Sequence, residues 1–219
     1  MLQHTTLKFL KALKQNNNKA WFDANRKNYE AAKTDFIAFV QQLINGISQF
    51  DVEVNGLLAK SCIFRINRDI RFSKDKSPYK TNMGAYINPG GKKENTPGYY
   101  IHLEPGKSFI AGGLYVPEAA MLAKVRQEID YNFEAWKSII SNKNFKKYFT
   151  TVDGIETLSR PPKGYEANNP AIEYLKMKSF IVSRNFTDEI MVSKTLLKES
   201  LNTFNAMKPM IDFLREAIA

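Results

Sequence analysis

The sequence predicts an α+β fold in which one antiparallel sheet packs against helices from both ends of the chain. Apolar residues recur at helical spacing near both ends, whereas segments between them alternate apolar and polar residues. Short connections rich in Pro and Gly separate these segments, so successive strands should be antiparallel neighbours in a meander. One hydrophobic core can serve 219 residues, and we therefore expect a single domain over residues 1–219.

Two helices are expected before the sheet. Residues 6–14 carry apolar side chains at helical spacing, and the preceding threonines suit an N-cap. A longer helical pattern begins near Lys19, with Asn18 as its cap, and continues to Ile47. The aromatic residues on these helices are interpreted as core, because they lie within the apolar stripe.

Five segments have the apolar and polar alternation of half-buried strands. They are residues 62–73, 83–88, 99–104, 108–115 and 179–185. Arg68 breaks the alternation of the first segment, so a bulge or a turn into helix is the alternative there. The connections at residues 89–91 and 104–107 contain Pro and Gly and are predicted to be turns.

Helices are expected again after the strand predicted at residues 108–115. Residues 119–129 and 133–140 have helical patterns, and residues 159–170 form an irregular loop rich in Pro and Gly. Thr187 caps a last helical region, which Pro209 should kink or divide.

Several features point to a reducing compartment. Cys62 is the only cysteine, so the chain forms no internal disulfide and no multi-cysteine zinc site. Lysines interrupt the apolar residues of the N-terminal segment, and no later run approaches the roughly 20 apolar residues of a membrane span. We expect a cytoplasmic protein without a membrane partner.

The positive charge is concentrated in one part of the chain. Residues 61–100 hold eight Lys or Arg and three Asp or Glu, which is half of the formal net charge of +10. Concentrated positive charge attracts anions such as phosphates, carboxylates and nucleic-acid backbones. The alternative is a solvated basic face without a partner.

The basic segment at residues 64–81 contains the candidate ligand-binding residues. Arginine binds a carboxylate or phosphate through a planar fork, lysine supplies a compact charge, and a tyrosine hydroxyl can donate to a ligand oxygen. The predicted binding residues are Arg65, Arg68, Arg71, Lys76, Tyr79 and Lys80.

Three residues are candidates for proton transfer. Asp69 and Asp75 stand between cations, so they either orient the arginines or act as a general base or metal ligand. His102 shares one face of its predicted strand with Tyr100 and Glu104. It becomes a proton-transfer group if it lies beside the basic cluster, and is otherwise a structural histidine.

No cofactor is predicted. The sequence has no P-loop and no nucleophile elbow, and the Gly112-Gly113 pair is too short for a dinucleotide fingerprint. Magnesium is expected only if the protein carries out phosphoryl chemistry, in which case Asp69 and Asp75 would hold the ion through the phosphate.

The chain resembles a known family over most of its length. It carries the pattern R-x-x-R-D-x-R-F-x-x-D-K-x-x-Y from Arg65 to Tyr79. It also carries N-N-x-x-W-F-x-x-N-R-x-x-Y-E from Asn17, G-Y-Y-I-H-L-E-P-G from Gly98 and R-P-P-K-G-Y from Arg160. Together these motifs resemble an uncharacterised bacterial family, numbered 2461 among domains of unknown function.

That family has no assigned reaction, so the resemblance implies a characteristic cluster of residues and no chemistry. The cluster comprises Arg65, Arg68, Asp69, Arg71, Asp75, Lys76 and Tyr79.

Four functional hypotheses follow from the sequence. The first is binding of a small molecule that carries a phosphate or carboxylate, which makes an anionic small molecule the expected partner. The second is an enzyme that acts on a phosphorylated substrate by Asp/His proton transfer. The third is nucleic-acid binding, with Tyr79, Tyr99 and Tyr100 as stacking surfaces. The fourth is an internal ion-pair network without a ligand.

Overall fold

Four strands form an antiparallel sheet at the centre of the molecule, in a computed structural model that describes residues 1–219. The strands are β1 (Met83–Ile87), β2 (Gly98–Leu103), β3 (Ser108–Leu114) and β4 (Phe180–Phe186). They are neighbours in chain order, which confirms the predicted meander. In this register His102 on β2 lies opposite Gly84 on β1 and Phe109 on β3.

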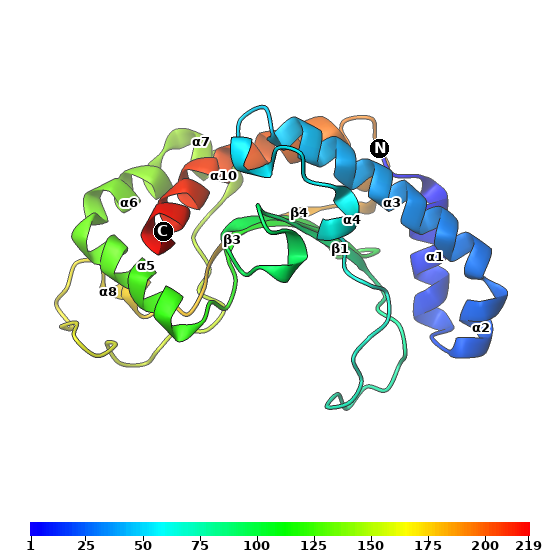
Figure 1. Cartoon of the computed structure of the whole chain (residues 1–219), viewed down its shortest axis with the longest axis horizontal. Coiled ribbons are helices and arrows are strands. Elements are labelled where there is room, and N and C mark those ends of the chain that lie inside the picture. The colour runs from blue at the N-terminus through cyan, green and yellow to red at the C-terminus, as the bar shows by residue number, and fades with distance from the viewer.

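Two long helices cover one face of the sheet, as the sequence predicts. They are α3 (Arg26–Ile47) and α10 (Leu196–Ile218). In Figure 1 the molecule has the outline of an arch, and these two helices run along its upper side. The β2 side chains on this face are Tyr99, Ile101 and Leu103, and all three are fully buried. They belong to a hydrophobic cluster of 46 buried residues, to which all four strands and both long helices contribute side chains.

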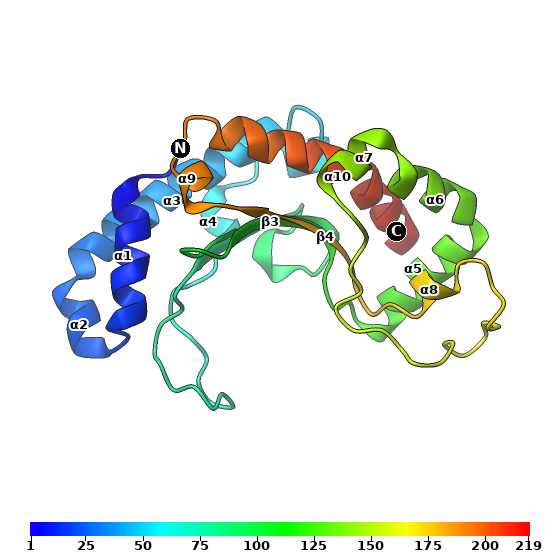
Figure 2. The same ribbon diagram turned by 180° about the vertical axis from the view of Figure 1, so that it is seen from behind.

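Smaller helices extend the arch at both ends (Figures 1 and 2). One end consists of α1 (His4–Gln15) and α2 (Lys19–Ala24), and the other of α5 (Ala119–Tyr131), α6 (Phe133–Ser141), α7 (Lys143–Tyr148) and α8 (Ile172–Leu175). The remaining helical turns are η1 (Val52–Val54), α4 (Ala59–Cys62), η2 (Gly91–Lys93) and α9 (Asp188–Met191). None of these helices has the length and apolarity that a membrane crossing requires.

The N-terminal helices follow the predicted pattern except at Asn25. The side chain of Asn18 accepts a hydrogen bond from the Trp21 N–H at 3.0 Å, which confirms it as the cap of α2. The helix predicted from Lys19 to Ile47 is divided, because the Asn25 backbone leaves the helical region at φ −106° and ψ 16°. The side-chain amide of Asn25 also donates a hydrogen bond to the Trp21 carbonyl, and this local bond ends α2.

The C-terminal helical region is divided before Pro209 rather than at it. Thr187 caps α9 by accepting the Ile190 N–H, and a short break then precedes α10. Pro209 lies inside α10, which continues as one helix, so of the two predicted outcomes, a kink or a division, the division does not occur. The red C-terminal part of α10 turns away from the line of its orange part in Figure 2, in keeping with the predicted kink.

The predicted strand over residues 62–73 is also wrong. Cys62 ends α4, and the following residues form only isolated bridges, at Ile63 and Asn67. The apolar residues of the alternation do not form one buried face, since Cys62 and Ile66 are buried whereas Phe72 is 96% exposed. Asp69 accepts the Arg71 N–H at 3.3 Å, and such local side-chain bonds compete with extended pairing.

Candidate functional site

Residues 63–82 form an irregular hairpin that we call the arm. Its two sides are linked by backbone hydrogen bonds from Lys80 N–H to Ile66 O at 2.8 Å and from Arg68 N–H to Pro78 O at 2.9 Å. Its base is joined to β1 by the bond from Phe64 N–H to Gly84 O at 3.0 Å. Figure 1 shows the arm extending below the sheet, on the side away from α3 and α10. The motif that carries the family resemblance therefore lies on a projecting element.

Tyr79 fastens the arm to the N-terminal helices. Its ring is 6% exposed and stacks on Phe22 of α2, with ring centres 3.9 Å apart and an angle of 14°. The Asn17 side chain accepts the Tyr79 N–H at 3.1 Å and donates to its carbonyl at 2.9 Å. The structure thus places this predicted ligand residue in the core, with a packing role.

Tyr79→Ala is expected to lower the free energy of unfolding by about 3 kcal/mol, because it removes a buried aromatic ring. Chemical denaturation would measure this loss, and hydrogen exchange should show faster opening of the arm than of the sheet. Phe72→Ala is the matched control on the same arm, and it should change stability by less than about 0.5 kcal/mol since the ring is exposed. Equal effects of the two substitutions would contradict the anchoring role.

The tip of the arm holds two ion pairs. Arg68 pairs with Asp75, while Arg71 donates to both oxygens of Asp69 at 3.0 and 2.7 Å. The Lys76 ammonium donates to the Ile70 carbonyl at 3.0 Å. The structure thus gives each of these cations a partner within the arm.

Both carboxylates at the tip are poor proton acceptors. Hydrogen bonds from Ser77, followed by that from Arg68, hold the pKa of Asp75 well below its usual range. Hydrogen bonds from Arg71 lower the pKa of Asp69 in the same way. These environments stabilise the ionised form and do not suit a general base near neutral pH.

A hollow of about 770 Å³ lies on the face of the sheet that the helices leave uncovered, and we call it the groove. Its 17 lining residues are Phe64, Lys80, Tyr86, Lys92, Lys93, Glu94, Asn95, Tyr100, His102, Phe109, Ala111, Gly112, Gly113, Tyr115, Val116, Ile155 and Ile181. Lys80 and His102 are the two predicted site residues among them. The predicted residues of the arm tip, from Arg68 to Lys76, do not line it.

The rim of the groove exposes large apolar side chains. Phe64 is 38% exposed, Tyr115 56%, Val116 53% and Ile155 48%. Exposed apolar residues that gather around one concavity indicate a binding surface rather than scattered surface hydrophobes.

The backbone is strained at two of these rim residues. Val116 has φ 42° and Ile155 has φ 60°, and they are the only non-glycine residues of the chain with positive φ. β-branched residues rarely adopt this conformation, which costs on the order of 1–3 kcal/mol and is concentrated at functional sites. Both strained residues line the groove, which supports its choice as the candidate site.

The lining of the groove carries an excess of positive charge, with three lysines and one acid, Glu94. Lys92 donates to the Ile63 carbonyl at 2.5 Å and so supports the backbone. Lys80 is partly buried over the Phe64 ring, at 5.5 Å, and forms no ion pair. Burial, followed by the charge of nearby Arg65, lowers the pKa of Lys80, so an anion placed there would stabilise the ammonium.

A hydrogen-bonded chain runs along the groove side of β2. The Tyr100 hydroxyl lies 3.0 Å from Nδ1 of His102, and Nε2 of His102 lies 3.2 Å from a Glu104 carboxylate oxygen. The imidazole stacks on Phe109, with ring centres 4.7 Å apart. The alternation of the sequence correctly placed Tyr100, His102 and Glu104 on one face.

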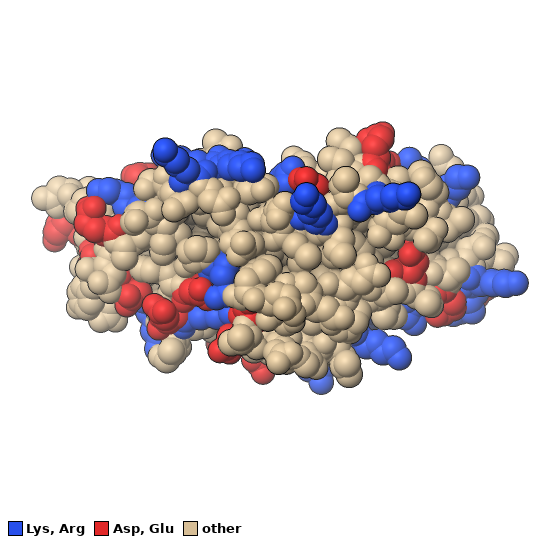
Figure 3. Space-filling view, turned by 90° about the horizontal axis from the view of Figure 1, so that it is seen from above, with Lys and Arg blue, Asp and Glu red and all other residues tan.

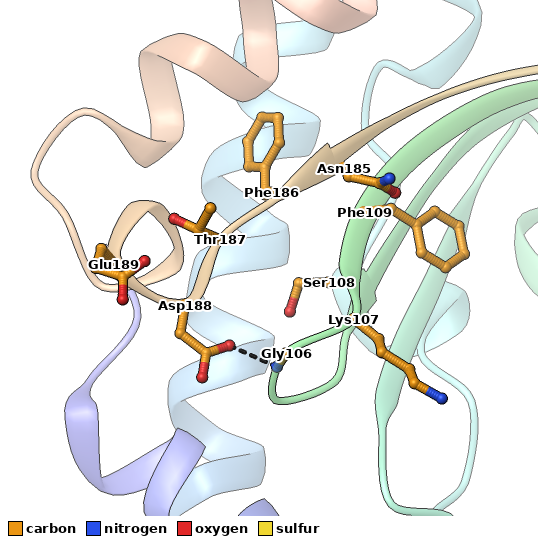
Figure 4. A pocket seen from close by; sticks show the side chains of 9 residues that line it. All are labelled: Gly106, Lys107, Ser108, Phe109, Asn185, Phe186, Thr187, Asp188 and Glu189. Atoms are coloured by element: carbon orange, nitrogen blue, oxygen red, sulfur yellow. Dashed lines mark hydrogen bonds between the residues drawn. The ribbon is translucent and has the colours of Figure 1, made fainter.

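A second hollow, of about 720 Å³, lies beside the turn between β2 and β3 (Figure 4). Of its two acids, Asp188 accepts the Gly106 N–H at 2.8 Å and pairs with Lys11 at 3.0 Å. These bonds connect the turn to α9 and α1, and they give the Asp188 carboxylate partners within the protein. The groove is therefore the stronger candidate.

The comparisons with known proteins give one match. The model of a family described as "Conserved hypothetical protein (DUF2461)" matches residues 5–213. No curated protein and no solved structure matches the chain.

Proposed function

We propose, for a chain that belongs to the conserved hypothetical protein family DUF2461, that the groove binds a small molecule with an aromatic or apolar body and an anionic group. The observation that carries this proposal is the Lys80 ammonium, which is partly buried without a carboxylate partner in an aromatic-lined hollow. A desolvated cation favours a ligand anion, and the rim residues offer an apolar surface for the rest of the ligand.

The proposal keeps part of the binding set that the sequence predicts. Lys80 is the anchor for the anion, and Arg65 adds positive charge close to it. The tip residues Arg68 and Arg71 are left out, since each is paired with an aspartate of the arm. The nucleic-acid hypothesis loses support, because Tyr79 and Tyr99 are buried and cannot stack on bases.

Lys80→Gln is expected to weaken binding of anilinonaphthalenesulfonate, an aromatic sulfonate, by about tenfold. Fluorescence titration measures this affinity directly. Lys74→Gln is the matched control, because it removes the same charge from the arm outside the groove and should change the affinity less than about twofold.

Phenylnaphthylamine serves as the control ligand, since it keeps the aromatic body and lacks the sulfonate. We expect it to bind more weakly and to be unaffected by Lys80→Gln. The proposal fails if the wild-type protein binds neither dye, or if Lys74→Gln weakens the sulfonate as much as Lys80→Gln does.

A further inference from the structure

We infer that Tyr100, His102 and Glu104 form a proton-coupled relay, in which the Tyr100 hydroxyl donates to an oxygen of the bound anion when His102 takes up a proton. The inference rests on the proposed function, because Tyr100 and His102 line the same groove. It narrows the ligand to a class whose anionic oxygens accept hydrogen bonds only, such as a sulfonate, a carboxylate or a phosphate diester.

When His102 is neutral, the hydrogen bonds among Tyr100, His102 and Glu104 fix which atoms of these side chains carry a proton. A carboxylate accepts hydrogen bonds only, so Nε2 of His102 must carry the hydrogen that faces Glu104 at 3.2 Å. Nδ1 is then an acceptor and receives the Tyr100 hydroxyl at 3.0 Å. Because the only hydroxyl proton of Tyr100 is donated to His102, the phenol oxygen presents only lone pairs to the groove and repels the oxygens of an anion.

Protonation of His102 reverses the direction of the Tyr100 hydrogen bond. One proton from solvent adds to Nδ1, which then donates to the phenol oxygen while Nε2–H remains on Glu104. The Tyr100 hydroxyl is freed to donate to a ligand oxygen, and no covalent bond of the ligand changes. Binding of an acceptor-only anion is therefore coupled to uptake of one proton, so acid strengthens it and base weakens it.

The surroundings of Tyr100 suit a donor that keeps its proton. Burial raises the pKa of Tyr100 to about 12, so the phenol remains neutral across the range in which histidine titrates. Gly84, on the neighbouring strand, leaves room for the hydroxyl, because a Cβ there would lie 2.5 Å from the phenol oxygen. Gly84→Ala should displace the hydroxyl from His102 without a clash against backbone.

Few other charged groups face His102. Its cross-strand neighbours are Gly84 on β1 and Phe109 on β3, and both are uncharged. Glu104 is the acid in contact with it, and this carboxylate also accepts the Thr81 hydroxyl at 3.4 Å. Lys80 lines the same groove and is the cation whose titration must be separated from that of His102.

The test is the affinity for anilinonaphthalenesulfonate between about pH 5.5 and about pH 8, a range in which the sulfonate keeps its charge and histidine changes its own. We expect the wild-type affinity to fall about tenfold as pH rises and to be independent of pH in His102→Gln. In Tyr100→Phe it should fall less steeply, because that variant keeps the imidazolium charge and lacks the hydroxyl. A dependence that survives His102→Gln would assign the titration to another group, such as Lys80, and overturn the relay.

NMR of the imidazole nitrogens provides a second measurement that does not depend on the variants folding. The chain has two histidines, and His4 serves as the internal reference on the N-terminal helix. We expect the hydrogen of neutral His102 on Nε2, and the dye should move the titration of His102 to higher pH while that of His4 stays unchanged.

The outcomes separate the two proposals. Dye binding that does not vary with pH, or a neutral His102 with its hydrogen on Nδ1, overturns the relay and leaves the proposed function standing. Absence of dye binding at every pH overturns the proposed function and the relay with it.

Discussion

Asp51→Ala is expected to lower the free energy of unfolding by about 3 kcal/mol, because it leaves the largely buried guanidinium of Arg215 without its carboxylate partner. The Asp51 side chain is 1% exposed and accepts two hydrogen bonds from the Arg215 guanidinium, each of 2.9 Å. It also accepts the hydroxyl of fully buried Tyr99 at 2.8 Å. One carboxylate thereby joins the start of η1, strand β2 and the end of α10.

Chemical denaturation with a two-state fit measures the effect of Asp51→Ala. The matched control is Glu134→Gln, which removes an acid from the exposed pair with Lys137 and should change stability by less than about 1 kcal/mol. A loss of similar size in both variants would show that the Asp51 network does not stabilise the fold.

Gly113→Ala is expected to destabilise the protein by about 4 kcal/mol, from a strained backbone and a steric clash. Gly113 has φ +122°, a conformation that residues with a Cβ essentially do not adopt. An added Cβ would also lie 2.0 Å from the carbonyl oxygen of Phe180 on β4. The neighbouring Gly112 has a related role, since a Cβ there would lie 2.1 Å from Met207 of α10.

Thermal and chemical denaturation would measure the loss for Gly113→Ala. Gly106→Ala is the control for the backbone contribution alone, because Gly106 has φ +76° and no atom near its missing Cβ. It should cost only about 1 kcal/mol. If the two variants lose the same stability, close packing of β3 against β4 is not the reason for the glycine at position 113.

Local sequence signals predicted most of the fold. Pro and Gly at residues 89–91 and 104–107 mark turns that join neighbouring strands, so the meander follows from the connections. The apolar stripes of α3 and α10 identify the helices that cover the sheet. The strand predicted at residues 62–73 failed because alternation shows which residues could share a face, and not whether a second layer covers that face.

The candidate site was only partly predictable. Charge density identified Lys80, and alternation placed His102 on one face with Tyr100 and Glu104. Charge density could not show that Arg68 is paired within the arm, because that pair depends on how the arm turns back. Strain at the groove rim leaves no sequence signal either, since Val and Ile are ordinary residues for a strand.

The most direct test of the account is a map of amide chemical-shift changes as anilinonaphthalenesulfonate is added to the uniformly labelled protein. If the groove binds the anion, the largest changes should lie at Lys80, His102 and Tyr115, which line the groove from three different segments of the chain. Changes confined to the tip of the arm, from Arg68 to Lys76, would contradict the account and would place the binding site at the paired arginines instead.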